Sequence, residues 1–407
     1  MLFNSLPFLY LFLPVTYAVF WRLRTKRARH VWLTLTGYAF YSMWDFRFCG
    51  LMLVSTLISY GAGLGFLKAR GPGARKALLL IPIAADLALL GFFKYADFLL
   101  GFGNAVSGWL GSPARFPLLN VILPVGISFY TFHTITYIVD CYRGKVVPTR
   151  SFFEFSCFVS LFTQLVAGPI VRFSQIEKDL GSIDTAGRRE GLESGWSFFA
   201  IGLFKKVLVA DTIAMIIDPA LADPASLSTA GMWLCALGYT YQLYFDFSGY
   251  SDMAVGLGRL FGLRIPQNFN SPYRAADVAD FWRRWHISLS TCLRDYLDIP
   301  LGGSRGGALR TGVNLMVTML LGGLWHGANW TFVLWGGYHG LLLCLNRAVA
   351  DRLDKVPFRV RSAVTFLLVL LGWVVFRAAD VPTAFLMLRK MFVWESAPLF
   401  AGWAILL

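Results

Sequence analysis

The stretch NLMVTMLLGGLWHGANWTFVLWGGYHG, residues 314–340, decides the expected fold because it places a histidine within a strongly apolar run. A helix that crosses a membrane needs about 20 mostly apolar residues, and this run extends over roughly 312–346. His326 follows Arg310 by 16 residues, which is about 24 Å along an α-helix. We therefore expect His326 to lie well inside a bilayer. An ionisable side chain at that depth is costly and indicates a functional site.

The whole chain has the composition of an integral membrane protein. Of its 407 residues, 57% are hydrophobic and 15% are charged, whereas soluble domains are about 45–50% apolar and about 25% charged. Apolar runs alternate with short basic loops, which excludes a soluble enzyme, a disordered chain and a secreted disulfide scaffold. The six cysteines are scattered without metal-ligand spacing, so we expect neither a metal site nor a disulfide framework.

The apolar runs predict about ten membrane-spanning helices. They lie at roughly 2–21, 31–44, 49–67, 77–98, 117–139, 153–171, 194–215, 229–249, 312–346 and 361–378. The loops 22–30, 68–76 and 143–150 are strongly basic, and the positive-inside rule places all three in the cytoplasm. Much of the net charge of +14 is therefore an orientation signal rather than a nucleic-acid-binding face. The first run precedes its basic residues, the reverse of a cleaved signal peptide, so we expect it to be retained.

The segment 259–310 breaks this alternation, because it carries eight arginines together with many aromatic residues. We interpret it as structured backbone at the cytoplasmic face, or as a re-entrant segment shielded by neighbouring helices. Within it, the residue spacing over Asp280–Leu297 predicts one amphipathic helix. Its arginines face water or lipid phosphate, and His286 points inward.

The residues near His326 in sequence are small, aromatic or polar: Gly322, Gly323, Trp325, Gly327, Asn329 and Trp330. The glycines leave room for a ligand or allow helices to pack closely, and the other residues provide aromatic walls and a polar donor. The alternative is a glycine-packed helix crossing with one hydrogen-bonded histidine. A neutral imidazole can take a proton from a hydroxyl group and return it, which is its commonest catalytic role.

Other titratable residues in the apolar runs have less distinctive settings. His339 follows His326 by 13 residues, about 140° around a continuous helix. We expect His339 to be structural unless the helix breaks at Gly336 and Gly337. We interpret His133 as a hydrogen-bonded core histidine.

Two carboxylates, Asp246 and Asp252, stand in the stretch YFDFSGYSDMAVG. The turn residues between them favour a helix end, where the carboxylates cap the helix or pair with arginines. The alternative is that one of them orients a catalytic group. On these residues alone, the chain fits either a transporter or an intramembrane enzyme.

Five long motifs occur in the chain: LPVGISFYTFHTITYIVDCYRG (123–144), LVAGPIVRFSQI (165–176), YFDFSGYSDMAVGLGRLFG (244–262), NFNSPYRAADVADFWRRWHISLSTCLRDYLDIPLGG (268–303) and the stretch at 314–340. Their order resembles that of the membrane-bound O-acyltransferase family, most closely its bacterial alginate O-acetyltransferase branch. The resemblance is strong over about 120–345 and rests mainly on hydropathy before that.

The resemblance implies an all-α fold of about ten transmembrane helices, with re-entrant and amphipathic cytoplasmic helices around a central tunnel. One membrane domain then covers residues 1–407. It comprises N-terminal helices at 1–119, the catalytic core at 120–345 and C-terminal helices at 346–407.

The resemblance also implies catalytic roles for His326 and His286. His326 would act as general base on an acceptor hydroxyl, and His286 would position the thioester carbonyl or stabilise its oxyanion. The substrate-binding residues that it implies are Trp325, Asn329, Trp330, Trp282, Arg283 and Arg284. The first three would line the tunnel. The two arginines would face an acidic carrier protein, the phosphates of coenzyme A or lipid headgroups.

An enzyme of this kind is a multi-pass protein of the bacterial inner membrane, without a bound cofactor or metal and without a nucleic-acid partner. Its donor would be an acyl thioester, acetyl-CoA or acyl carrier protein, at the cytoplasmic face. Its acceptor would be an exported, alginate-like polysaccharide, reached through a periplasmic acetyltransferase partner. The alternatives are a D-alanyl transferase for teichoic acid, a peptidoglycan or cellulose O-acetyltransferase and, outside the enzymes, a polysaccharide-associated transporter.

The chain departs from the family pattern in two respects. Cys292 and Asp298 stand where related sequences commonly carry an aromatic residue, which alters the mouth at which a donor docks. The sequence also ends in AGWAILL, within a hydrophobic stretch, where relatives usually continue through further spans. We therefore expect a short or truncated C-terminal part.

Overall fold

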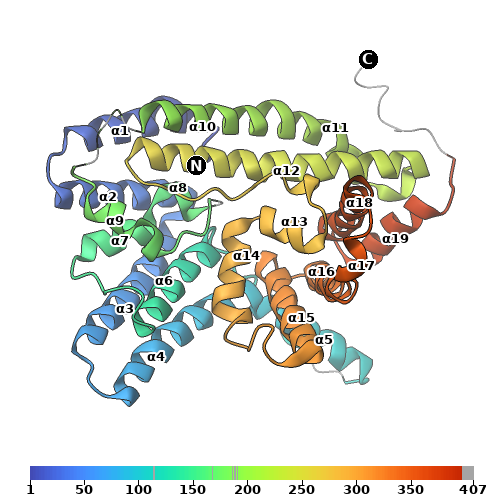
Figure 1. The fold of residues 1–407 in the computed structure, drawn as a ribbon, viewed down its shortest axis with the longest axis horizontal. Coiled ribbons are helices and arrows are strands. Elements are labelled where there is room, and N and C mark those ends of the chain that lie inside the picture. Colours follow the sequence, from blue (N-terminus) through green and yellow to red (C-terminus); the bar gives the residue numbers. More distant parts are fainter. Residues whose placement is uncertain (113–114, 167, 186, 188, 190, 397–407) are drawn as a thin grey trace. The chain divides into compact units, whose positions relative to one another are not determined.

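The structure is a computed structural model that describes residues 1–112, 115–166, 168–185, 187, 189 and 191–396 (Figure 1). All regular elements in these ranges are helices, which agrees with the predicted all-α class. Internal contacts gather the chain into two compact units. The first comprises Met1–Ile201 and Tyr250–Pro266, and the second comprises Gly202–Gly249 and the chain from Gln267 onward. The AGWAILL end, 401–407, lies outside the described residues.

The α-helices up to residue 181 are α1 (Leu13–Arg22), α2 (Lys26–Asp45), α3 (Cys49–Lys68), α4 (Pro72–Leu90), α5 (Ala96–Trp109), α6 (Ile127–Tyr142), α7 (Phe152–Ser160), α8 (Phe162–Leu165) and α9 (Phe173–Gly181). Those that follow are α10 (Leu192–Phe204), α11 (Asp211–Leu221), α12 (Thr229–Leu260), α13 (Val278–Arg284), α14 (Ile287–Leu293), α15 (Gly307–His326), α16 (Trp330–Ala348), α17 (Ala350–Leu353), α18 (Phe358–Arg377) and α19 (Val381–Phe392).

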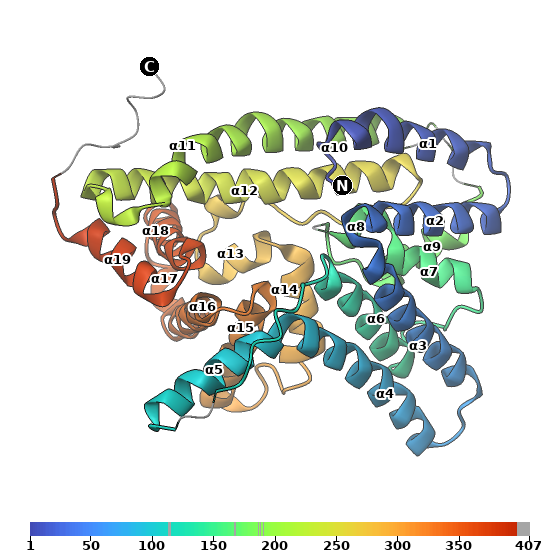
Figure 2. The ribbon, with the colours of Figure 1, turned by 180° about the vertical axis from the view of Figure 1, so that it is seen from behind.

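In the first unit, α3, α4 and α6 pack against one another (Figure 2). The buried carboxyl group of Asp86 on α4 joins all three helices. It accepts hydrogen bonds from Ser55 Oγ on α3 and Thr134 Oγ1 on α6, both at 2.6 Å. A carboxyl group buried among apolar helices is tolerated only with such donors, so this contact specifies how the three helices meet.

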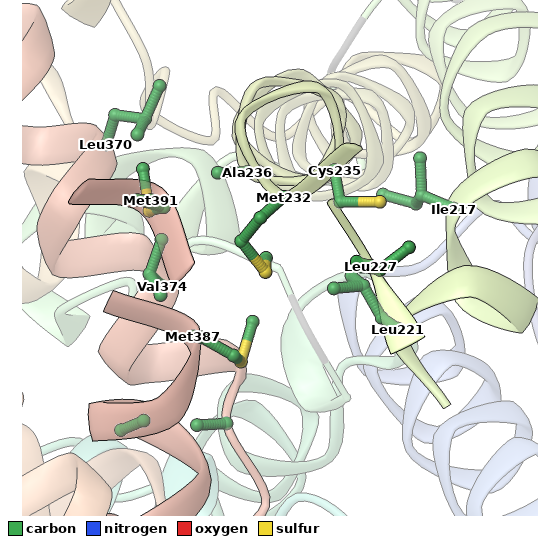
Figure 3. Packing of buried hydrophobic residues seen from close by; sticks show 12 residues of the cluster. Ile217, Leu221, Leu227, Met232, Cys235, Ala236, Leu370, Val374, Met387 and Met391 are labelled. Atoms are coloured by element: carbon green, nitrogen blue, oxygen red, sulfur yellow. The ribbon is translucent and has the colours of Figure 1, made fainter. Parts of the chain in front are cut away.

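In the second unit, a hydrophobic cluster joins α11, α12, α18 and α19 (Figure 3). Its buried side chains include Ile217, Leu221, Met232, Cys235, Leu370, Val374, Met387 and Met391. Methionine side chains adapt to irregular gaps between helices. The cluster fixes the position of α18, which also carries Trp373 and Phe376 to the aromatic residues around the candidate site.

The helices α15 and α16 form a closely packed hairpin in the second unit. A Cβ atom on Gly323 would overlap the carbonyl oxygen of Phe332, and one on Gly336 would overlap that of Met319. The predicted single helix over 312–346 is therefore wrong, because the chain reverses at residues 327–329. The helix does not break at Gly336 and Gly337, which lie inside α16.

The predicted amphipathic helix over Asp280–Leu297 is also interrupted. The helix α13 ends at Arg284, α14 begins at Ile287, and a π-helical turn, η7 (Arg294–Asp298), follows. Between α13 and α14, His286 adopts a left-handed conformation with φ +44°. The spacing of the apolar side chains agrees with a continuous helix, but a tertiary contact of His286, described below, interrupts the helix at that residue.

Four stretches of the described chain are long and apolar enough to cross a membrane: Lys26–Lys68, Pro72–Trp109, Gly307–His326 and Phe358–Arg377. A shorter apolar helical segment covers Phe8–Arg22. These helices agree with the membrane protein that the composition predicts. The number of about ten crossings stays a prediction.

Candidate active site

His326 is the last residue of α15, at the turn into α16. Gly327 continues in extended conformation, and Asn329 caps the next helix by accepting a hydrogen bond from the backbone N–H of Thr331 at 3.1 Å. The Asn329 amide also donates to the carbonyl oxygen of Ala379 at 2.8 Å. Asn329 thus holds the turn that follows His326, a role that its position in the sequence did not indicate.

Aromatic rings surround the imidazole of His326. The ring centroids of Trp325, Trp335 and Phe376 lie 5.0, 5.2 and 5.2 Å from that of His326. Trp335 comes from α16 and Phe376 from α18, so three helices supply these walls. Aromatic rings make large apolar contacts and exclude water from a reacting group.

His326 lines a cavity of about 240 Å³ within the second unit. Its other lining residues are Trp282, Leu289, Ser290, Leu293, Arg294, Asp298, Leu315, Thr318, Met319, Gly322, Trp335 and Leu343. The cavity is mostly apolar, with a few polar groups and one imidazole. This composition is typical of a small-molecule site.

Four polar atoms of cavity-lining residues are buried and have no hydrogen-bond partner among the described residues. They are the indole nitrogens of Trp282 and Trp335, Thr318 Oγ1 and Asp298 Oδ1. Burial raises the pKa of Asp298, although the nearby charge of Arg294 opposes this. Because buried polar groups generally find partners, these atoms are suited to bind a ligand that has both donors and acceptors.

His286 is almost fully buried beside the cavity-lining residues but does not line the cavity itself. Its ring centroid lies 4.7 Å from that of Phe247 and 5.8 Å from that of Trp325. Burial lowers the pKa of His286 well below its ordinary value, and the charge of His326 lowers it further. The structure therefore brings the two histidines into one electrostatically coupled site, with Trp325 in contact with both rings.

The remaining residues predicted for substrate binding lie in different settings. Trp282 lines the cavity, whereas Trp330 and Arg283 do not and are exposed. Arg283 and Arg284 both pair with Asp280, at 3.4 and 2.9 Å. The basic residue of this segment that does reach the cavity is Arg294, which was not singled out from the sequence.

The two other histidines of the apolar runs do not line the cavity of His326. His339 is fully buried, and its ring centroid lies 5.3 Å from that of Trp282 and 5.0 Å from that of Trp335. It supports the cavity wall from behind. His133 is fully buried in α6, where its ring centroid lies 5.3 Å from that of Phe158, and the hydrogen bond expected for it stays a prediction.

The helix end expected near Asp246 and Asp252 is not present, because α12 continues from Thr229 to Leu260. Asp246 forms an ion pair with Lys206 at 2.7 Å, and Lys206 also pairs with Asp211 at 2.8 Å. The partner of Asp246 is thus a lysine rather than an arginine. Neither carboxylate lines the cavity of His326.

The apolar helices and the histidine in an apolar cavity are typical of an enzyme that works within a membrane. The sequence pattern of the membrane-bound O-acyltransferase family matches residues 119–382, more than half of the chain, so the chain belongs to that family. It is 45% identical over 403 residues to a probable alginate O-acetylase of Azotobacter vinelandii, covering 96% of this chain and 78% of the relative. It is 46% identical over 405 residues to a probable alginate O-acetylase of Pseudomonas putida, covering 96% and 80%. It is also 38% identical over 426 residues to a peptidoglycan O-acetyltransferase of Helicobacter pylori, again covering 96% and 80%.

Proposed function

We propose that this O-acyltransferase transfers acetyl groups for the O-acetylation of an exported, alginate-like polysaccharide. Its similarity to alginate O-acetylases over nearly the whole chain supports the reaction. The observation that carries the proposal is the position of His326, which lines an apolar cavity whose lining residues hold buried polar atoms with no hydrogen-bond partner among the described residues. A cavity of this kind suits an acyl thioester, whose chain is largely apolar and whose carbonyl groups accept hydrogen bonds.

In the proposed reaction, His326 acts as general base. The proton of the acceptor hydroxyl moves to the imidazole, and the hydroxyl oxygen forms a bond to the acyl carbon. The carbon–sulfur bond breaks, the electron pair leaves with sulfur, and the imidazolium returns its proton to the thiolate. The aromatic walls around His326 exclude water, which would otherwise hydrolyse the thioester.

The donor is acetyl-CoA or an acyl carrier protein at the cytoplasmic face of the bacterial inner membrane. By the positive-inside rule, this is the face that carries the basic loops. About ten crossings form one domain around the tunnel, and a periplasmic partner completes transfer to the polymer. Arg283, Arg284 and Arg294 contribute positive charge at the donor's entrance. Trp325 contributes an apolar wall beside the two histidines.

The test is genetic and chemical. A deletion strain is complemented with wild-type protein or with His326→Ala, and the acetyl content of each extracellular and wall polymer is measured by mass spectrometry. We expect wild-type protein to restore acetylation and His326→Ala to reduce it by at least about 10²-fold, the contribution of a general base. The amount of each variant in isolated membranes is measured alongside. Full acetylation with His326→Ala would exclude it as the base.

Peptidoglycan is the second candidate acceptor, because a peptidoglycan O-acetyltransferase is similar over 96% of the chain. In the same deletion strain, loss of acetyl groups from glycan strands with intact alginate acetylation would assign peptidoglycan instead. Loss of D-alanyl esters would assign the teichoic-acid reaction.

A further inference from the structure

The backbone around His286 is hydrogen-bonded to a short segment, residues 268–270, that has no role in the proposed reaction. The backbone N–H of Ile287 donates to the carbonyl oxygen of Asn268 at 2.9 Å, and the N–H of Asn270 donates to that of Arg284 at 3.0 Å. These bonds enclose His286, which has the left-handed φ of +44°. A non-glycine residue keeps this conformation only where its surroundings enforce it, which is frequent at functional sites.

The side chain of Asn268 has one possible orientation. It is almost fully buried, and one of its terminal atoms lies 3.0 Å from the backbone nitrogen of Ser288. A backbone N–H can only donate, so the atom that faces it is the amide oxygen. The same oxygen accepts a hydrogen bond from Ser288 Oγ at 2.8 Å.

This orientation determines the tautomer of His286. Nδ1 of the imidazole lies 3.2 Å from the same amide oxygen of Asn268, and an oxygen that accepts requires a proton on Nδ1. In the neutral ring, Nε2 then carries a lone pair and no proton. Nε2 is buried and has no hydrogen-bond partner among the described residues.

The choice of an asparagine at this position is itself informative. Its oxygen receives three hydrogen bonds, whereas its amide nitrogen is buried without a partner in the part of the chain that is described. An aspartate would accept the same three bonds and leave no orphaned N–H group. It would also place a negative charge against the imidazole and favour the imidazolium form. Asparagine fixes the tautomer and keeps the ring neutral.

The geometry points to Asn268 as a positioning residue that holds His286 in the Nδ1–H tautomer, so that its Nε2 is an acceptor for a donor group of the bound substrate other than the hydroxyl that His326 deprotonates. This inference rests on the proposed function of the site. It replaces the expectation that His286 stabilises an oxyanion, because a neutral ring in this tautomer has no proton on Nε2 to donate. Phe247 and Trp325 pack on the imidazole ring of His286. Among the described residues, His326 is the titratable group whose charge acts on it.

The tautomer is tested directly by ¹⁵N NMR of the full-length protein in detergent, labelled at histidine. The chain has five histidines, and loss of one signal pair in His286→Gln assigns the signals of His286. We expect a protonated Nδ1 and an unprotonated Nε2 at neutral pH. A protonated Nε2, or an imidazolium, would overturn the proposal whether or not the protein shows any activity.

The role in the reaction is tested with Asn268→Asp, by measuring the pH dependence of thiol release from acetyl-CoA. An opposite charge in contact raises the pKa of a histidine by about 1–3 units. The ¹⁵N signals of His286 should therefore titrate about 1–3 units higher in Asn268→Asp. Because the neutral ring is the acceptor, the acid limb of the activity profile moves up once this raised pKa exceeds that of His326. Asn270→Asp is the matched control, since Asn270 is exposed two residues away, and its profile should not move.

The outcomes separate the two proposals. An unmoved ¹⁵N titration of His286 in Asn268→Asp would show that Asn268 does not control its ring, and higher activity at low pH would show that His286 does not act as a neutral acceptor. If wild-type protein releases no thiol from acetyl-CoA, the proposed donor fails, and the ¹⁵N signals of His286 still decide the tautomer.

Discussion

The two adjacent glycines of α16 give a prediction in which one substitution serves as the control for the other. A Cβ atom at Gly336 would overlap the carbonyl oxygen of Met319 and lie 3.1 Å from Leu320 Cα, so it meets the backbone of α15. A Cβ atom at Gly337 has an ordinary contact, 3.6 Å from Leu320 Cδ2. Alanine raises helix propensity by the same amount at both positions, about 1 kcal/mol, so the difference between the variants isolates the clash.

We expect Gly336→Ala to be less stable than Gly337→Ala by about 1–3 kcal/mol, the usual cost of overpacking a closely packed contact. The backbone of α15 has to move away, and that movement also displaces Gly322 and His326 at the cavity. Acetylation should therefore fall in Gly336→Ala and persist in Gly337→Ala. The assay is unfolding of the purified proteins in one detergent, with acetylation measured in parallel. Equal midpoints for the two variants would refute the close packing of α15 on α16 as the reason for the glycine.

Two further outcomes follow from a buried hydroxyl group and a partly buried carboxylate. Thr318→Val removes a buried hydroxyl without a partner among the described residues. We therefore expect the stability of the protein to rise by about 1 kcal/mol and the KM for the donor to increase, as measured by denaturation and steady-state kinetics. An unchanged KM would show that the hydroxyl does not belong to the donor site. Burial raises the pKa of Asp280, but bonds from Ala276 N–H and Arg284 and the charge of Arg283 outweigh it and leave the pKa below its ordinary value. The stabilisation is therefore present above the ordinary pKa, about 3.9, and is lost as the pH falls through the lowered value. Unfolding measured against pH should show this loss for wild-type protein and not for Asp280→Asn.

The amino-acid sequence by itself determined the class of protein and predicted the residue at the centre of the candidate site. Helices in an apolar environment satisfy their own backbone hydrogen bonds, so long apolar runs indicate them without any tertiary information. His326 was found because an ionisable residue in such a run is costly. The inward direction of His286 agrees with its burial, although the continuous helix from which it was predicted is interrupted at that residue.

The tertiary structure decided what surrounds these histidines. The cavity of His326 combines Trp282, Thr318 and Trp335 from three separate helices, and no periodicity within one helix relates them. The interruption of the helix at His286 depends on hydrogen bonds with Asn268, 18 residues earlier. The local residue spacing does not encode these bonds. Hydropathy and helical period report which residues are buried. The proton on one imidazole nitrogen is set by the donor or acceptor that the folded chain places against it.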